Sequence, residues 1–394
     1  MRHLLDHVGP VFRKELLDAV RDRRSLMSAL LFPMFAPLMI NLLFGSIAAR
    51  EQRAEDLVFH VQGAAQAPGL MAWIERADHE VVEADGDLFA RVRSGELELA
   101  VLVDPDYAED FTDGAPAKVS LIVDGSKNEL SPLVRRARRV LGSYGTQIST
   151  LRLIARGVSA DLRTPVRLEE LDIATSQQRS ANFLSFIPLF IIMAAFVSGM
   201  NVAIDTTAGE RERGSLEPLL ITPVSRTAIV VGKWLVTVSF ASVGIVLVLA
   251  GTLFMLQRMS LEDLGIRLDI GVVQVIAILA GTMPLAFLAA GVQLLVSTFA
   301  RSFKEAQTYV SMLIFIPMIP GMIAAVSSLP NEPWMAAVPS LGQQMLLTRV
   351  LGGDDPGLTL FLVAGGSSML LGLLCVMLTA KLFQHERIVF GVTS

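Results

Sequence analysis

Six long apolar stretches without a single charged residue dominate this 394-residue sequence. The first runs from about residue 26 to 47, where only Ser28, Asn41 and Ser46 are strongly polar. The other five cover about residues 181–204, 235–256, 270–300, 306–329 and 357–380. Each stretch has the roughly 20 residues that a helix needs to cross a hydrocarbon core about 30 Å thick. The sequence therefore predicts a polytopic α-helical membrane protein with six transmembrane helices.

The low share of charged residues excludes several other classes of protein. Charged residues make up 18% of the chain, against about 25% in a typical soluble domain. The net charge of −5 is too small to indicate a nucleic-acid partner. The single cysteine, Cys375, excludes an internal disulfide and a cysteine-based metal cluster. We expect residues 26–47 to be a retained helix rather than a signal peptide, because several charges precede them and no small-residue cleavage site follows.

The distribution of basic residues predicts which ends of the helices face the cytoplasm. Fourteen Lys and Arg residues lie at the chain ends and after the second and fourth stretches, whereas the opposite short loops hold three. The fourteen are Arg2, Arg13, Lys14, Arg21, Arg23, Arg24, Arg211, Arg213, Arg226, Lys233, Arg301, Lys304, Lys381 and Arg387, and the three are Arg258, Arg267 and Arg349. Cytoplasmic loops carry such an excess, and large domains are exempt from the rule. We therefore expect both termini in the cytoplasm and residues 48–180 outside it.

Residues 48–180 have the pattern of a separate α/β domain, large enough to bury its own core. Strands are expected at 57–61, 99–103 and 119–123, and helices at 68–76 and 87–94. Ser131, followed by Pro132, is expected to cap a further helix. The apolar face of that helix comprises Leu133, Ala137, Val140, Leu141, Tyr144, Ile148 and Leu151. The predicted organisation is a cytoplasmic amphipathic helix in residues 1–25, a transmembrane helix in 26–47, the extracytoplasmic α/β domain in 48–180 and five transmembrane helices in 181–394.

Two polar clusters in the α/β domain suggest ligand binding, and both have a simpler explanation. The arginines within residues 135–139 are either an anion-binding patch or, as we favour, the solvated face of the amphipathic helix. His60 and His79, with Asp78 and Glu80, are either metal ligands or, as we favour, surface residues. The sequence contains no GxxxxGK[ST] motif and no nucleophile in a recognisable setting. We therefore expect no catalytic residue, no metal and no bound cofactor in this chain.

The polar residues in the middle of the predicted spans are all neutral. They are Asn41, Asn201, Gln274, Gln293 and Ser311. Ion pumps and proton-coupled carriers tend to keep Asp, Glu or Arg at this depth. Hydrogen bonding between helices is the simpler explanation for neutral groups. Asn41, Asn201 and Gln293 are the candidate residues of a transport pathway.

One predicted cytoplasmic segment, residues 209–226, differs from an ordinary loop. Its sequence is GERERGSLEPLLITPVSR, in which charged residues precede an apolar ridge of Leu216, Leu219 and Leu220. A connecting loop has no need of that ridge. A short helix that places it in a partner's groove does.

This segment, together with Val231-Gly232-Lys233, resembles the signature of type-2 ABC exporter permeases, the ABC-2 family, and within that family the branch of sodium-efflux permeases. The similarity extends over nearly the whole chain: a basic amphipathic helix at about residues 8–24, one span, a large external domain and five more spans. The stretch from Pro333 to Gln344 is also similar to the family, in which it belongs to short re-entrant helices, here within about residues 330–350. Phe12, Leu16, Leu17 and Val20 of the first helix are expected to face lipid or the first span.

The resemblance implies that residues 209–226 hold a coupling helix, which docks into a separate ATPase subunit. The docking residues it implies are Glu210, Arg211, Glu212, Arg213, Leu216, Glu217 and Leu219. ATP and Mg²⁺ are then expected on two copies of that partner, and the permease is expected to be a homodimer in lipid. The motif is weak evidence for the substrate, because relatives export drugs, lipids and polysaccharides.

We therefore expect the permease subunit of an exporter, with no enzymatic activity of its own. Sodium efflux is one alternative for its substrate, and export of a drug, a lipid or another amphiphile is the other. A membrane-anchored sensor or scaffold is an alternative of a different class. Six spans argue against it, because one or two suffice to anchor a domain.

Overall fold

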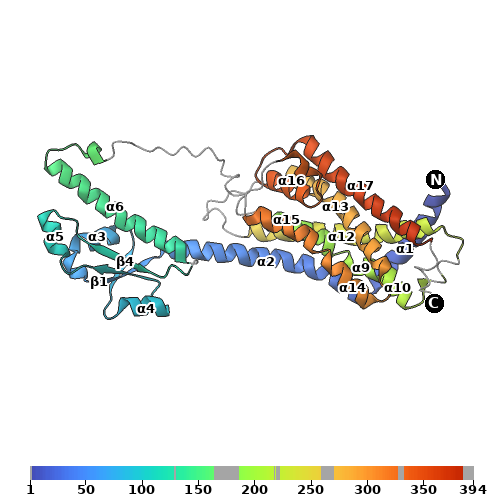
Figure 1. The fold of residues 1–394 in the computed structure, drawn as a ribbon, viewed down its shortest axis with the longest axis horizontal. Helices are drawn as coiled ribbons and strands as arrows, with labels where there is room; N and C mark the ends of the chain where they lie inside the picture. The colour runs from blue at the N-terminus through green and yellow to red at the C-terminus, as the bar shows by residue number, and fades with distance from the viewer. Residues whose placement is uncertain are drawn as a thin grey trace. The chain divides into compact units, whose positions relative to one another are not determined.

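The computed structural model describes residues 2–127, 130–163, 186–216, 218, 222–258, 270–326 and 332–384. The chain divides into two compact units (Figure 1). The α/β unit is Leu43–Asp172, and the helical unit combines Met1–Leu42 with Ile173–Ser394. Each unit has its own hydrophobic core.

The α/β unit is built on a mixed four-stranded sheet in the order β2-β1-β3-β4. Its strands are β1 (Val58–Gln62), β2 (Glu80–Glu83), β3 (Leu99–Val103) and β4 (Val119–Val123). Strand β1 pairs in parallel with β2 and β3, and β3 pairs antiparallel with β4. Three strands lie where the sequence predicts them. The edge strand β2 was missed because its four residues begin and end with glutamate and show no apolar alternation.

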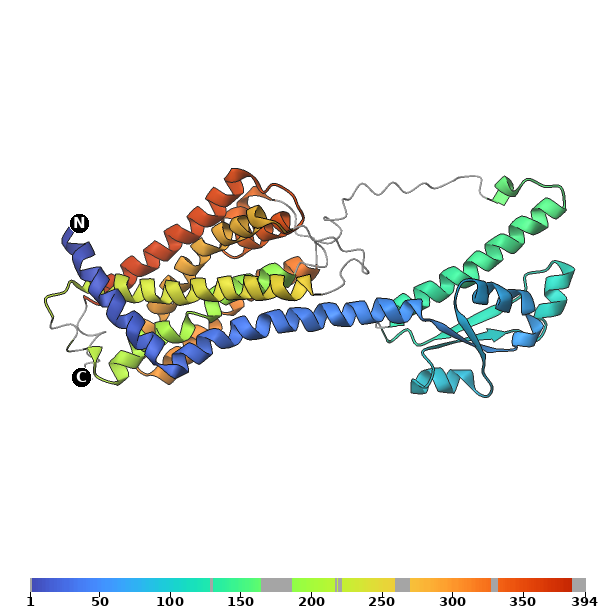
Figure 2. The ribbon, with the colours of Figure 1, turned by 180° about the vertical axis from the view of Figure 1, so that it is seen from behind.

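Helices cover both faces of this sheet (Figures 1 and 2). Helices α3 (Pro68–Arg76) and α6 (Ser131–Ala155) pack on one face, and α4 (Leu88–Ser94) packs on the other. The short helix α5 (Tyr107–Asp113), which the sequence did not predict, follows β3. Because successive strand residues point to opposite faces, β3 directs Val101 into the core under α3 and α6 and Ala100 into the core under α4.

Helix α6 differs from its prediction at both ends. Leu130, not Ser131, occupies the N-cap position, and it makes no capping hydrogen bond through its side chain. Ser131 is instead the first helical residue, with Pro132 in the turn where a missing N–H costs nothing. At the other end Leu151 is 52% exposed, although the predicted apolar face included it. Leu133 and Ala137 are buried as expected.

His79 is buried rather than on the surface, so its predicted position was wrong. Its ring packs edge-on against Phe59, with 5.6 Å between ring centroids, and Arg136 Nε lies 3.5 Å from its Nε2. Burial, and secondly the charge of Arg136, lower the pKa of His79 below its ordinary value. Nowhere in the described ranges do three His, Cys, Asp or Glu side chains gather as a metal site would require.

The helical unit contains long helices, most of them apolar, and several short helical turns. They are α1 (Arg2–Arg21), α2 (Arg23–Glu55, of which residues from Leu43 belong to the α/β unit), α8 (Phe186–Val197), α9 (Met200–Ile204), the π-helix η4 (Asp205–Gly209), α10 (Glu210–Glu212), α12 (Arg226–Gln257), α13 (Val272–Phe299), α14 (Phe303–Met312), α15 (Phe315–Val326), η6 (Pro333–Ala337), α16 (Leu341–Leu351) and α17 (Gly357–Leu382).

Six helical segments of the described chain are long and apolar enough to cross a membrane, the number that the sequence predicts. They are Ser25–Ser46, Phe186–Glu212, Arg226–Gln257, Val272–Phe299, Phe303–Ile323 and Gly357–Leu382. The last of them packs closely against α13. A Cβ at Gly291 would lie 2.8 Å from the carbonyl oxygen of Gly372, so this close approach needs a residue without a side chain. The unit is a polytopic helical membrane domain.

Helix α1 packs against α12, and α2 begins after a break at Asp22 (Figure 2). The Asp22 carboxylate accepts hydrogen bonds from the backbone N–H and the hydroxyl of Ser25. Of the apolar side chains on α1, Leu16 packs in a core with Phe240, whereas Leu17 and Val20 are about half exposed. One face of α1 therefore packs on the protein, and the other is free for lipid.

The segment predicted to be re-entrant, about residues 330–350, holds η6 and α16 in its described part. The Gln343 amide donates hydrogen bonds to the Ala364 carbonyl oxygen at 2.9 Å and to Ser368 Oγ at 2.8 Å. Gln343 is fully buried, so these bonds hold α16 against α17.

Candidate functional site

The second candidate span is interrupted twice before it reaches the 209–226 segment. The α-helical pattern stops at Ser198 and Gly199, and the π-helix η4 follows from Asp205 to Gly209. Such π-helical turns are rare and often lie at functional sites. Arg213 reaches back to Asp205, with 2.7 Å between Nη1 and Oδ1. A Cβ at Gly209 would lie 2.8 Å from the same Oδ1, so glycine leaves room for this ion pair.

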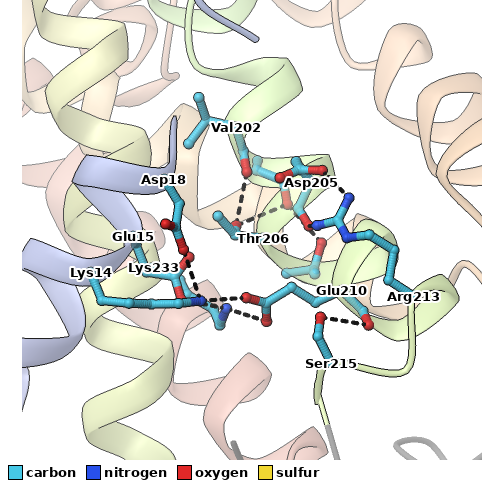
Figure 3. Close-up of polar contacts among 12 residues, drawn as sticks. Lys14, Glu15, Asp18, Val202, Asp205, Thr206, Glu210, Arg213, Ser215 and Lys233 are labelled. Atoms are coloured by element: carbon cyan, nitrogen blue, oxygen red, sulfur yellow. Dashed lines mark hydrogen bonds and ion pairs between the residues drawn. The ribbon is translucent and has the colours of Figure 1, made fainter. Parts of the chain in front are cut away.

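A buried group of charged side chains joins this segment to two other helices (Figure 3). Lys233 Nζ of α12 lies 2.6 Å from Glu210 Oε2 and 2.9 Å from Glu15 Oε1 of α1. Lys14 Nζ lies 2.9 Å from the other oxygen of Glu210. We call these four residues, Lys14, Glu15, Glu210 and Lys233, the ion-pair cluster. It connects α1, the end of the second span and α12.

The ion-pair cluster balances its charges inside the protein. The side chains of Lys233 and Glu15 are 1% and 2% exposed, and that of Lys14 is 48% exposed. Burial lowers the pKa of Lys14, but the carboxylates of Glu210 and Glu15 outweigh it and raise that pKa above its ordinary value. Removing one partner of a buried ion pair typically costs about 3–5 kcal/mol, because the other charge is left without compensation. The cluster therefore holds the three elements together only while the buried charges of Lys233, Glu15 and Glu210 are present together.

The next three charged residues bind the chain's own backbone and side chains. Arg211 donates from Nη1 to the Ala300 carbonyl oxygen at 2.7 Å. Glu212 accepts a hydrogen bond from the backbone N–H of Phe303, the first residue of α14, at 2.6 Å. Arg213 forms its ion pair with Asp205, the first residue of the π-helix η4. The segment is therefore hydrogen-bonded to the residue that follows α13 and to the first residue of α14, in addition to the ion pairs of Glu210 with α1 and α12.

The predicted docking residues divide into three groups. Glu210 and Leu216 face the protein interior, and Leu216, at 2% exposure, packs in a core with Trp234 and Phe383. Neither side chain is exposed on the surface of the chain. Glu212 and Arg213 are exposed, and Arg211 is half-buried. Glu217 and Leu219 lie outside the described residues.

The candidate pathway residues lie in different settings. Gln293 is buried, and its amide donates to the Phe196 carbonyl oxygen at the end of α8. It thereby binds a backbone group next to the interruption of the second span, which is the interhelical role expected of a neutral residue. Asn41 is half-buried on α2. Asn201 lines a polar cavity of about 610 Å³ that also includes Ser28, Asp205 and Gln307.

Sequence reasoning missed Lys14, Glu15 and Lys233 as members of a site. Glu15 had a signal, because it lies four residues from both Val11 and Ala19 on the buried face of α1. A carboxylate among apolar neighbours needs a cation nearby. Lys233, at the start of a long apolar helix, is that cation, but a separation of 218 residues hides the pair in the sequence.

Comparison with known proteins agrees with this architecture. The family profile described as "ABC-2 family transporter protein" matches residues 10–351. The chain is 27% identical to the ABC transporter permease protein NatB of Bacillus subtilis (strain 168) over 393 residues, which cover 97% of this chain and 99% of the relative. No solved structure matches the chain significantly. The chain therefore belongs to the ABC-2 family of transporters, as a membrane transport subunit whose ATPase is a separate subunit.

Proposed function

We propose that this chain exports its substrate from the cytoplasm and takes its energy from two copies of an ATPase that dock on the 209–226 segment. The observation that carries the proposal is the ion-pair cluster. Glu210 lies near the start of the segment and forms ion pairs with Lys14 of α1 and Lys233 of α12. A force applied to the segment by a partner is therefore passed directly to two helices of the membrane unit.

The docking surface that we propose is smaller than the one the sequence suggested. It comprises Glu212, Arg213 and the exposed Pro218, and it retains Glu217 and Leu219. Leu216 is left out of this surface, because its buried side chain packs the segment against the helical bundle. ATP and Mg²⁺ would be held by the partner.

We further propose that both termini and the ion-pair cluster face the cytoplasm, and that residues 48–180 lie outside it. The excess of Lys and Arg at one set of helix ends supports this orientation. Two copies of the permease would form a homodimer, with one ATPase bound to each copy.

For the substrate we propose two classes, which a transport assay separates. Sodium ion is the first, through the resemblance to sodium-efflux permeases. A drug, a lipid or another amphiphile is the second, because the described bundle has no buried carboxylate in the middle of its spans to bind a cation. A sensor or scaffold without transport would leave the ion-pair cluster without a mechanical purpose.

Cysteine cross-linking tests the docking surface. Replacing Cys375 by serine gives a cysteine-free chain, into which Pro218→Cys is introduced. A short thiol cross-linker should then join this permease to the co-expressed ATPase. Ser126→Cys, an exposed position in the α/β unit, is the matched control and should give no adduct. Cross-linking from position 126 but not from position 218 would contradict the proposal.

A further inference from the structure

A groove of about 620 Å³ opens in the α/β unit between α5, β4 and the C-terminal half of α6. Its walls are mostly apolar, with Leu70, Phe111, Val119, Leu141 and Ile148 among the lining residues. Small-molecule sites are typically concave, mostly apolar and about 300–1,000 Å³ in volume. This groove has the size and the lining of such a site.

The groove stays open because α6 presents two glycines to it. Gly142 and Gly145 both line the groove and are three residues apart, which places them on one face of the helix. No atom lies within 4 Å of the position that a Cβ would take at either glycine. The opposite wall is aromatic: the rings of Tyr107 and Phe111 stack with 5.6 Å between centroids. An apolar guest would therefore meet an aromatic wall and, at the two glycine positions, a helix surface without side chains.

One end of the groove is positively charged. Arg152 lies over the Phe111 ring, 4.7 Å from its centroid, and donates hydrogen bonds to the carbonyl oxygens of Phe111 and Gly114. A guanidinium nitrogen of Arg156 lies 3.2 Å from the position of a Cβ at Gly114. Within the described chain neither arginine forms an ion pair, although α5 ends with the acidic Asp113. Within the described chain, the acceptors of Arg152 are therefore uncharged carbonyl oxygens, and Arg156 has no carboxylate partner.

We infer that the groove binds an anionic amphiphile, a long-chain carboxylate, with its aliphatic tail along α6 and its head group beside Arg152 and Arg156. The tail would exchange water for the apolar walls, a transfer worth about 0.8 kcal/mol per buried methylene. The carboxylate would be the anionic partner that neither arginine has in the described chain. This inference does not depend on docking of an ATPase or on the orientation of the chain in the membrane.

Photo-labelling of the full chain in lipid nanodiscs tests the inference. The probe is dodecanoate with a diazirine on its tail, and the labelled peptides are identified by mass spectrometry. Labelling should concentrate on α5 and α6. The alcohol and the amine with the same tail are the matched probes, and both should label these helices at least tenfold less than the carboxylate.

Leucine substitutions at the two glycines should fill the groove, because a Cβ at either position meets no atom within 4 Å. Gly145→Leu and Gly142→Leu should each lower labelling of α5 and α6 by about tenfold, whereas Gln147→Leu, at an exposed position of the same helix outside the groove, should leave it unchanged. Hydrogen exchange of β3 reports whether each variant keeps its fold. Unchanged labelling in both folded glycine variants would overturn the inference.

The exposed Arg156 provides a test that does not disturb the packing. Arg156→Glu should lower the preference for the carboxylate over the amine at least tenfold. An unchanged preference, or equal labelling by carboxylate and alcohol in the wild-type chain, would contradict the assigned head group whatever the glycine variants show.

Discussion

Lys233 determines whether the charged residues around it can remain buried. Its side chain is 1% exposed and bridges two carboxylates from parts of the chain far apart in sequence. The cost of removing charges from water is offset only because both carboxylates lie within 3 Å of one ammonium group. Glu15 and Glu210 therefore depend on Lys233 more than on the half-exposed Lys14.

We expect Lys233→Met to destabilise the protein by about 3–5 kcal/mol, because it leaves Glu15 and Glu210 buried without that cation. Lys14→Met should cost under about 1 kcal/mol, since water reaches this side chain. The midpoint of thermal unfolding in detergent measures both. Adding Glu15→Gln and Glu210→Gln to Lys233→Met should restore much of the loss. Equal midpoints for the two single variants would contradict the assigned burial.

His79 should make the α/β unit less stable in mild acid. Its pKa is lowered in the folded protein, chiefly by burial, so the unfolded chain binds the proton more readily. The stability is complete above the ordinary pKa of 6.5 and falls as the pH drops below it, by up to about 1.4 kcal/mol per pH unit.

Hydrogen exchange of β1 in the full chain, corrected for the intrinsic rate, measures this loss between pH 7.5 and pH 5.5. His79→Leu should remove most of the slope. His60, whose pKa burial and Arg91 also lower, would account for the remainder. A slope that is the same in the wild-type and His79→Leu chains would show that His79 is accessible to water.

At the scale of helices and strands, the sequence predicted elements best where one local pattern decides them. Strands β1, β3 and β4 and helix α3 follow apolar runs bounded by turn residues, and six spans follow from hydropathy alone. Strand β2 pairs at the sheet edge and has no such run. The inward direction of Glu210 depends on α1 and α12, which no local pattern of residues 209–226 contains. Docking residues were therefore the hardest part of the site to predict.

Leu216 should behave as a core residue of the permease. Leu216→Ala should destabilise the permease by about 2–5 kcal/mol, as large-to-small core substitutions do, and Leu216→Asp should reduce expression as well. Pro218→Asp, at an exposed position two residues away, is the control and should leave the unfolding midpoint unchanged while it weakens association with the ATPase. A stable Leu216→Asp permease that no longer binds the ATPase would show that Leu216 belongs to the docking surface.

At the scale of the whole molecule, we propose that the α/β unit lies outside the cytoplasm. In the cysteine-free background, a cysteine at Ser126 should react with a membrane-impermeant thiol reagent in intact cells. A cysteine at Gly214, exposed in the 209–226 segment, should react only after lysis. The reverse pattern would show that the orientation is inverted and would contradict export driven from the 209–226 side.

ATP hydrolysis by the purified chain, with and without its partner, tests whether a separate ATPase powers the permease through the 209–226 segment. The permease alone should show no hydrolysis above background, because its sequence has no phosphate-binding loop. The complex should hydrolyse ATP at a rate on the order of 1 s⁻¹ or faster, and Pro218→Asp should reduce the rate by dissociating the partner. Hydrolysis by the isolated permease, or a complex whose formation and rate are unaffected by every substitution in residues 211–219, would contradict the account.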